Sequence, residues 1–114
     1  MTAVTHVEPE TMSMLQEVME DGFEPLIQSY ISDSQHRVGE LRLALSQQDS
    51  EMIRRLAHSL KGSSGNVGAC HMAELCLQVE QQGRDGVLDG LDELLVQIEQ
   101  EMDEVFTIMQ GYIH

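Results

Sequence analysis

DGLDELLVQIEQEMDEVFTIM, residues 89–109, is the stretch of this sequence that decides the fold. Its apolar residues return at steps of three and four in a nearly heptad order: Leu91, Leu94, Leu95, Ile98, Met102, Val105 and Met109. Apolar residues at this spacing line one side of an α-helix and pack against neighbouring helices. We therefore expect a last helix that starts near Asp89 and belongs to a helical bundle. Its acidic residues are expected mostly on a solvated outer face: Asp89, Asp92, Glu93, Glu99, Glu101, Asp103 and Glu104.

The rest of the chain carries the same helical periodicity. The pattern predicts a short helix from Pro9 to near Gly22, a second over residues 23–45, a third over residues 50–65 and a fourth that stops at Gly83. Short loops between long amphipathic helices make neighbours antiparallel. The predicted fold class is all-α: an antiparallel four-helix bundle with an additional short N-terminal helix across one end. We expect one domain over residues 1–114, with residues 1–8 as a flexible N-terminal segment.

Composition and charge exclude several kinds of partner. The chain has 114 residues, 20 acids against 6 bases, and a formal net charge of −14. Nucleic acid and anionic membranes repel such a surface, so neither is expected as a partner. No stretch approaches the ~20 apolar residues of a membrane span, and the N-terminus lacks a signal-peptide pattern. Cys70 and Cys76 point to different sides of one helix and are expected as reduced thiols, in a cytoplasmic protein.

The segment RRLAHSLKGSSG, residues 54–65, is the one that carries chemistry. At about 100° per residue, the helix turns one apolar face toward the core. That face is formed by Met52, Ile53, Leu56, Leu60 and Val67. His58 projects to the opposite side, toward solvent. Four residues surround it there, with Arg55 at the flank: Arg54, Lys61, Gly62 and Gly65.

Three features of this outer face are unusual together. It presents one imidazole to solvent, and it gathers three of the six basic residues, including the only lysine, within residues 54–61. It also places Gly62 and Gly65 beside His58, although glycine costs about 1 kcal/mol relative to alanine inside a helix. Bare backbone at these two positions would let another surface come very close to the imidazole.

A neutral imidazole nitrogen is a good nucleophile toward an activated phosphoryl group. It needs no general base, because the attacking lone pair carries no proton. A phosphoryl group on His58 would add negative charge, and Lys61, three residues further along the helix, could pair with that charge. The alternative is that His58 is an ordinary solvated histidine and that the basic residues are ordinary surface.

A wider pattern around His58 resembles a known family. LAHSLKGSS (residues 56–64), followed by VGA (residues 67–69), is similar to the signature of histidine-containing phosphotransfer (HPt) domains of two-component phosphorelays. That signature is a histidine, Lys-Gly three and four residues later, then small residues and Gly-Ala at the helix end. AELCLQVE (residues 73–80) also resembles the next helix of the family, and the helix order agrees over about the whole chain.

The resemblance implies a role for each residue of the motif. His58 would be the phosphorylated residue, Lys61 the charge partner of the phosphoryl group, and Gly62 the small residue that admits a docking receiver domain. The docking surface would also include Gly65, Arg54, Arg55 and Ser59. The implied partners are receiver domains of hybrid sensor kinases and of response regulators. The chain ends with no receiver or ATP-binding sequence, so it resembles the free-standing bacterial members: a monomeric phosphoryl carrier without ATP-dependent kinase activity of its own.

No cofactor or metal is expected on this chain, and the Mg²⁺ would sit on the partner receiver. Cys70, His71 and Cys76 lack the second ligand pair that would complete a tetrahedral site. The hydroxyls of Ser63 and Ser64 are expected to bond the backbone one turn earlier, and a phosphate role for Ser64 stays open. The second functional hypothesis is a helical-bundle adaptor or antagonist that binds receivers or kinases without being phosphorylated. Such a protein has no need of an exposed nucleophile beside a base and two glycines.

Overall fold

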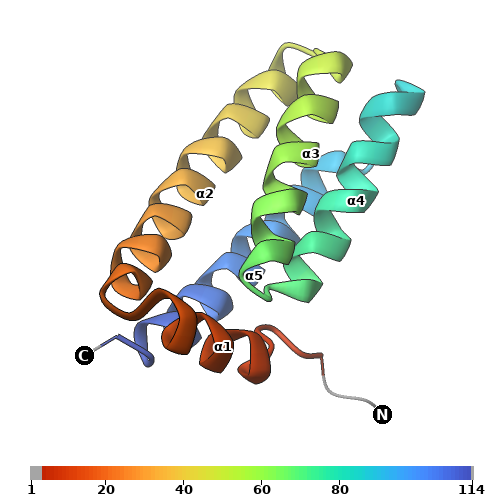
Figure 1. The fold of residues 1–114 in the computed structure, drawn as a ribbon. Helices are drawn as coiled ribbons and strands as arrows, with labels where there is room; N and C mark the ends of the chain where they lie inside the picture. Colours follow the sequence, from red (N-terminus) through yellow and green to blue (C-terminus); the bar gives the residue numbers. More distant parts are fainter. Residues whose placement is uncertain (1–3, 114) are drawn as a thin grey trace.

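Four long antiparallel helices form the body of the molecule, and a short helix lies across one end of it (Figure 1). The structure, a computed structural model, describes residues 4–113. The long helices are α2 (Phe23–Ser46), α3 (Ser50–Asn66), α4 (Cys70–Asp85) and α5 (Leu91–Gln110), and the short one is α1 (Pro9–Met19). No strand occurs among the described residues. The predicted all-α bundle with an additional N-terminal helix is confirmed.

Local sequence explains where the helices begin and end. Pro9 opens α1, where its missing N–H costs nothing. The Asp49 side chain caps α3 by accepting a hydrogen bond from the backbone N–H of Met52 at 3.1 Å. Gly86 ends α4 in the left-handed region with φ of 71°.

Two predicted helix ends are wrong. The first helix ends at Met19, and a 3₁₀ turn over Glu20–Gly22 joins it to α2. The fourth helix runs through Gly83 to Asp85, because the glycine that ends it is Gly86. Gly83 is a buried residue inside α4.

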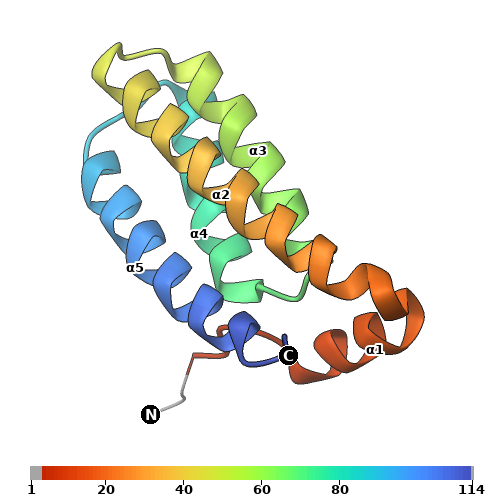
Figure 2. The same ribbon diagram turned by 90° about the vertical axis from the view of Figure 1, so that its left-hand side faces the viewer.

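The four long helices surround one core. In Figure 1, α3 lies between α2 and α4, and in Figure 2 α5 runs next to α4; α5 also contacts α2. The most completely buried large side chains come from α1 and all four of these helices: Met12, Ile27, Leu41, Ile53, Leu60, Met72, Leu91, Leu95, Ile98, Met109, Val79 and Val105. Two expectations fail here. Met52, placed on the apolar face, is exposed, and Glu101, placed on the solvated face, is buried.

The segment before α1 lies on the bundle. Val7 is buried, the backbone N–H of Glu8 donates to the Gly68 carbonyl at 2.9 Å, and the Cys70 thiol donates to the Thr5 carbonyl at 3.1 Å. These contacts argue against free movement over residues 5–8 of the predicted flexible segment, and residues 1–3 lie outside the described part. The boundaries of the single domain stay a prediction. Within residues 4–113, no helix is long and apolar enough to cross a membrane.

Candidate functional site

His58 lies in the middle of α3 on the outer face of the bundle. Its side chain is 64% exposed. Lys61 follows one turn later and is partly exposed, and Gly62 and Gly65 are exposed beside it. The structure therefore brings these four sequence-predicted residues together on one solvent-facing surface.

The neighbouring helix α4 supplies a residue that the sequence interpretation gave no role. Glu80 is only 2% exposed, and its carboxylate points at α3. One oxygen, Oε2, lies 2.9 Å from His58 Nδ1, and the other, Oε1, accepts a hydrogen bond of 2.7 Å from Lys61 Nζ. Arg84, one turn further along α4, approaches Oε2 at 3.4 Å. We call His58, Lys61, Glu80 and Arg84 the His58 cluster.

A signal for Glu80 was present in the sequence. The apolar stripe of α4 consists of Met72, Leu75, Cys76 and Val79, and Glu80 lies at the edge of this stripe when the helix is projected. A glutamate so placed is turned toward the core and is costly to bury unless it finds a charged or hydrogen-bonding partner. The stripe alone could not name those partners, because they belong to α3.

Glu80 is held as a carboxylate. The hydrogen bond from the Lys61 ammonium lowers the pKa of Glu80 below its ordinary value, and the bond with His58 lowers it further, against the opposing effect of burial. A charged, buried carboxylate with basic groups on both sides satisfies the rule that buried charges are paired.

This carboxylate fixes the state of the imidazole. An ionised carboxylate only accepts hydrogen bonds, so the contact of 2.9 Å requires the proton of a neutral His58 to sit on Nδ1. The other nitrogen, Nε2, then carries the lone pair on a ring that is mostly exposed. The cluster therefore leaves the lone pair of a neutral imidazole nitrogen on a mostly exposed side chain.

Packing within the bundle does not require glycine at the two positions beside His58. A Cβ built on Gly62 or on Gly65 meets no atom within 4 Å. An alanine would therefore fit at either position and would favour the helix. The bundle gains nothing from these glycines, whereas an approaching surface would gain room.

The remaining residues predicted for the docking surface flank the cluster. Arg54 holds Glu51 through hydrogen bonds of 2.6 and 3.1 Å, and Arg55 reaches the same carboxylate at 3.3 Å. Both pairs are i,i+3 or i,i+4 contacts on the exposed side of α3. Ser59 is half-buried next to His58. The two arginines are thus surface groups whose partner is within the chain.

The two serines after the Lys-Gly pair have structural bonds. The Ser63 hydroxyl donates to the Leu60 carbonyl at 3.2 Å, as expected for a bond one turn earlier. For Ser64 this expectation is wrong, because its fully buried hydroxyl bonds the Tyr30 hydroxyl of α2 at 2.8 Å. Ser64 thus lies in the α2–α3 interface, and its open phosphate role finds no support from this position. Burial raises the pKa of the Cys76 thiol to about 12, which keeps it protonated.

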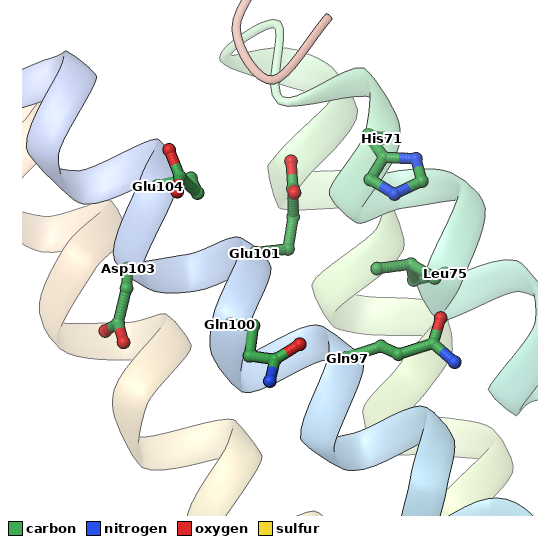
Figure 3. A pocket seen from close by; sticks show the side chains of 7 residues that line it. All are labelled: His71, Leu75, Gln97, Gln100, Glu101, Asp103 and Glu104. Atoms are coloured by element: carbon green, nitrogen blue, oxygen red, sulfur yellow. The ribbon is translucent and has the colours of Figure 1, made fainter. Parts of the chain in front are cut away.

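A cavity of about 540 Å³ lies elsewhere, between α4 and α5 (Figure 3). Its lining residues are His71, Leu75, Gln97, Gln100, Glu101, Asp103 and Glu104. None of them belongs to the His58 cluster. No group of three or more metal-ligating side chains within residues 4–113 has the geometry to hold an ion.

Comparison with known proteins places this geometry in a family. The family model of the Hpt domain matches residues 25–107, which contain the entire His58 cluster. The chain belongs to the Hpt domain family. The Hpt fold extends over nearly the whole chain: histidine-containing phosphotransfer protein B from Pseudomonas aeruginosa PAO1 is 34% identical, with a TM-score of 0.91 over 96% of this chain and 95% of that one.

Other similar proteins match with a lower TM-score or over a smaller share of this chain. The maize phosphotransfer protein ZmHP2 is 26% identical, with a TM-score of 0.82 over 93% of this chain and 87% of that one. The sensor protein TorS of Escherichia coli is 46% identical over 38% of this chain, and the multistep phosphorelay regulator 1 of Schizosaccharomyces pombe is 30% identical over 55%. The matched parts are only 5% and 23% of the lengths of these two relatives.

Proposed function

We propose that this Hpt protein carries a phosphoryl group on His58. It accepts the group from the phospho-aspartate of a receiver domain, as in a hybrid sensor kinase, and passes it to the aspartate of a response regulator receiver. One observation carries the proposal: an exposed imidazole whose Nδ1 is bound by Glu80, so that Nε2 is free. The glycines that leave open space beside this nitrogen give a receiver room to dock.

The transfer step needs no base on this chain. The lone pair of His58 Nε2 forms a bond to phosphorus while the bond between phosphorus and the aspartate oxygen breaks, and that electron pair returns to the aspartate carboxylate. The ring becomes positively charged, with its proton still on Nδ1. The Glu80 carboxylate, 2.9 Å from Nδ1, stabilises this charge. Reversal of the same step delivers the phosphoryl group to the next aspartate.

Lys61 serves the phosphorylated state. Its ammonium has three donors and uses one on Glu80, so further donors remain for phosphoryl oxygens. Arg84 contacts the other carboxylate oxygen of Glu80, Oε2, and its side chain is 61% exposed. A phosphoryl group on Nε2 would thus enter a locally basic surface on a chain whose net charge is −14. Receiver active sites are acidic, so the same local charge favours docking while the acidic remainder disfavours other contacts.

The proposed docking surface consists of Gly62, Gly65, Arg54, Arg55 and Ser59 around His58. Gly62 and Gly65 allow close approach, and the two arginines can exchange Glu51 for acidic groups of a receiver. We further propose a monomeric, cytoplasmic protein with a single domain, no cofactor and no ATP-dependent kinase activity of its own. The Mg²⁺ needed for the transfer would be held by the receiver.

The deciding experiment is phosphoryl transfer from a labelled receiver. The parent protein is expected to take up label that is lost in acid and retained in base, as phosphohistidine is. His58→Gln should take up none. His36→Gln is the matched control, because His36 is also an exposed histidine on a long helix and is 78% exposed. Label on the His58→Gln protein would overturn the assignment, and binding of receivers without any label on the parent would favour the adaptor hypothesis.

A further inference from the structure

Gly83 marks a close approach of α4 to α3. A Cβ built on this buried residue would lie 2.8 Å from the backbone nitrogen of Arg54, 3.0 Å from the carbonyl oxygen of Ser50 and 3.1 Å from Cα of Arg54. All three atoms belong to the α3 backbone, so no side-chain rotation can make room. The two helices can keep this separation only while position 83 lacks a Cβ.

This glycine differs from the others inside helices. At Gly39, Gly62 and Gly65 an added Cβ meets nothing within 4 Å. A helix-interior glycine costs about 1 kcal/mol relative to alanine. At Gly83 that cost is offset by closer packing between helices, which an alanine would prevent.

The close approach lies one turn from Glu80 on α4 and one turn from His58 on α3. Glu80 precedes Gly83 by three residues on α4, and Arg54 precedes His58 by four residues on α3. The bonds from Glu80 to His58 and to Lys61, 2.9 and 2.7 Å long, cross the same interface. Hydrogen bonds weaken steeply as they lengthen, so a shift of a few tenths of an ångström between the helices acts directly on them.

We propose that Gly83 is a positioning residue for the nucleophile: by holding α4 against α3 it keeps Glu80 within reach of His58 Nδ1 and so leaves the Nε2 lone pair free. The inference rests on the proposed function for its consequence in phosphoryl transfer. Its structural part, the protonation pattern of His58, is measurable without any partner.

The test is the tautomer ratio of His58 in ¹⁵N-histidine-labelled protein, measured by NMR at a pH where the ring is neutral. In the parent the Nδ1–H form should dominate. Gly83→Ala should lower the ratio of the Nδ1–H to the Nε2–H form about threefold or more, because the bond to Glu80 is weakened. Glu80→Asp, which shortens the reach of the carboxylate without adding a Cβ at position 83, should shift the ratio in the same direction.

The matched control is Gly39→Ala, where the new methyl group has open space and the tautomer ratio should stay at the parent value. Gly39→Ala should also stabilise α2, so the double variant Gly39→Ala/Gly83→Ala offsets a loss of stability from Gly83→Ala. A folded Gly83 variant with a lower melting temperature and an unchanged tautomer ratio would show that the glycine serves packing alone and would overturn the inference.

The two proposals fail separately. If His58→Gln still takes up label, the carrier function is wrong, while the tautomer result keeps its meaning for Gly83. If His58 is the acceptor and the Gly83→Ala ratio does not change, only the inference on Gly83 is wrong. When both hold, Gly83→Ala should slow labelling by about the same factor as it lowers the Nδ1–H population, and Gly39→Ala should not slow it.

Discussion

Two histidine–glutamate pairs lie in different regions of this molecule, and in both the imidazole Nδ1 contacts a carboxylate oxygen at the same distance. His58 Nδ1 lies 2.9 Å from Glu80, and His6 Nδ1 lies 2.9 Å from both carboxylate oxygens of Glu101. Both glutamates are buried, at 2% and 6% exposure. The bond between imidazole and carboxylate therefore does not by itself distinguish a reactive histidine from a structural one.

The surroundings of the two pairs differ. The side chain of His6 is half as exposed as that of His58, at 31% against 64%, and belongs to the segment before α1, which contacts the start of α4. Within residues 4–113 His6 is the only ion-pair partner of Glu101, whereas Glu80 also has Lys61 and Arg84. Of these two histidines, only His58 has the exposed glycines Gly62 and Gly65 beside it. Basic neighbours and room for a partner, added to the common bond, are what point to phosphoryl transfer at His58.

The largest expected effect comes from filling the open surface. Gly62→Phe should lower the rate of labelling by a receiver about a hundredfold or more, because displacement of the reacting atoms by about 1 Å can cost that much. The fold should be unaffected, since position 62 is exposed and a Cβ there meets no atom within 4 Å. Rates from rapid-quench labelling and the melting temperature measure the two effects.

The control for this substitution is Gly39→Phe, which also meets open space, on α2. It should leave the labelling rate near that of the parent. Equal slowing by both substitutions would mean that bulk anywhere on the surface impairs docking, and it would remove the special status of the His58 face.

The second effect concerns the basic neighbour that Glu101 lacks. Lys61→Ala should slow labelling of His58 about tenfold, because hydrogen bonds to charged groups contribute about 1.5–3 kcal/mol. Lys61→Arg should recover part of the rate, since it retains the charge on a longer side chain. Single-turnover labelling at saturating receiver measures the step. An unchanged rate in Lys61→Ala would show that the ammonium serves only to neutralise Glu80.

The third effect concerns the His6–Glu101 pair, and it should change the free energy of unfolding without changing phosphoryl transfer. His6→Ala leaves the buried Glu101 without its partner and should lower the free energy of unfolding by about 1 kcal/mol. Urea unfolding measures it. Labelling of His58 should continue at the parent rate, because His6 holds the N-terminal segment and takes no part in transfer. If His6→Ala slows labelling and leaves the unfolding free energy unchanged, the assignment of a purely structural role to the His6–Glu101 pair is wrong.

The same two pairs show what the sequence can predict and where it cannot. The outward position of His58 followed from helical periodicity, because a residue's angle around its own helix depends only on local sequence. The bonds of His58 and His6 did not follow, because each joins residues from different segments, 22 and 95 positions apart. Glu101 was misplaced for the same reason: among many acids on α5, only the packing of residues 4–8 shows which one is buried. Gly83 was read as a helix end because a glycine that ends a helix and one that allows close packing look alike in sequence.

The smallest expected effect is the dependence of stability on pH at Glu80. Its pKa is lower in the folded protein than the ordinary value of about 4.5, chiefly because Lys61 donates to the carboxylate. Folding therefore favours the charged form, and this contribution to stability is present above about pH 4.5 and is lost as the pH falls through the folded pKa. Glu80→Gln cannot titrate, so its difference in unfolding free energy from the parent should be largest near neutral pH and should shrink below about pH 4.5. Urea unfolding over this range measures the difference, and a constant difference at all pH values would mean that Glu80 is not held as the charged partner of Lys61 and His58.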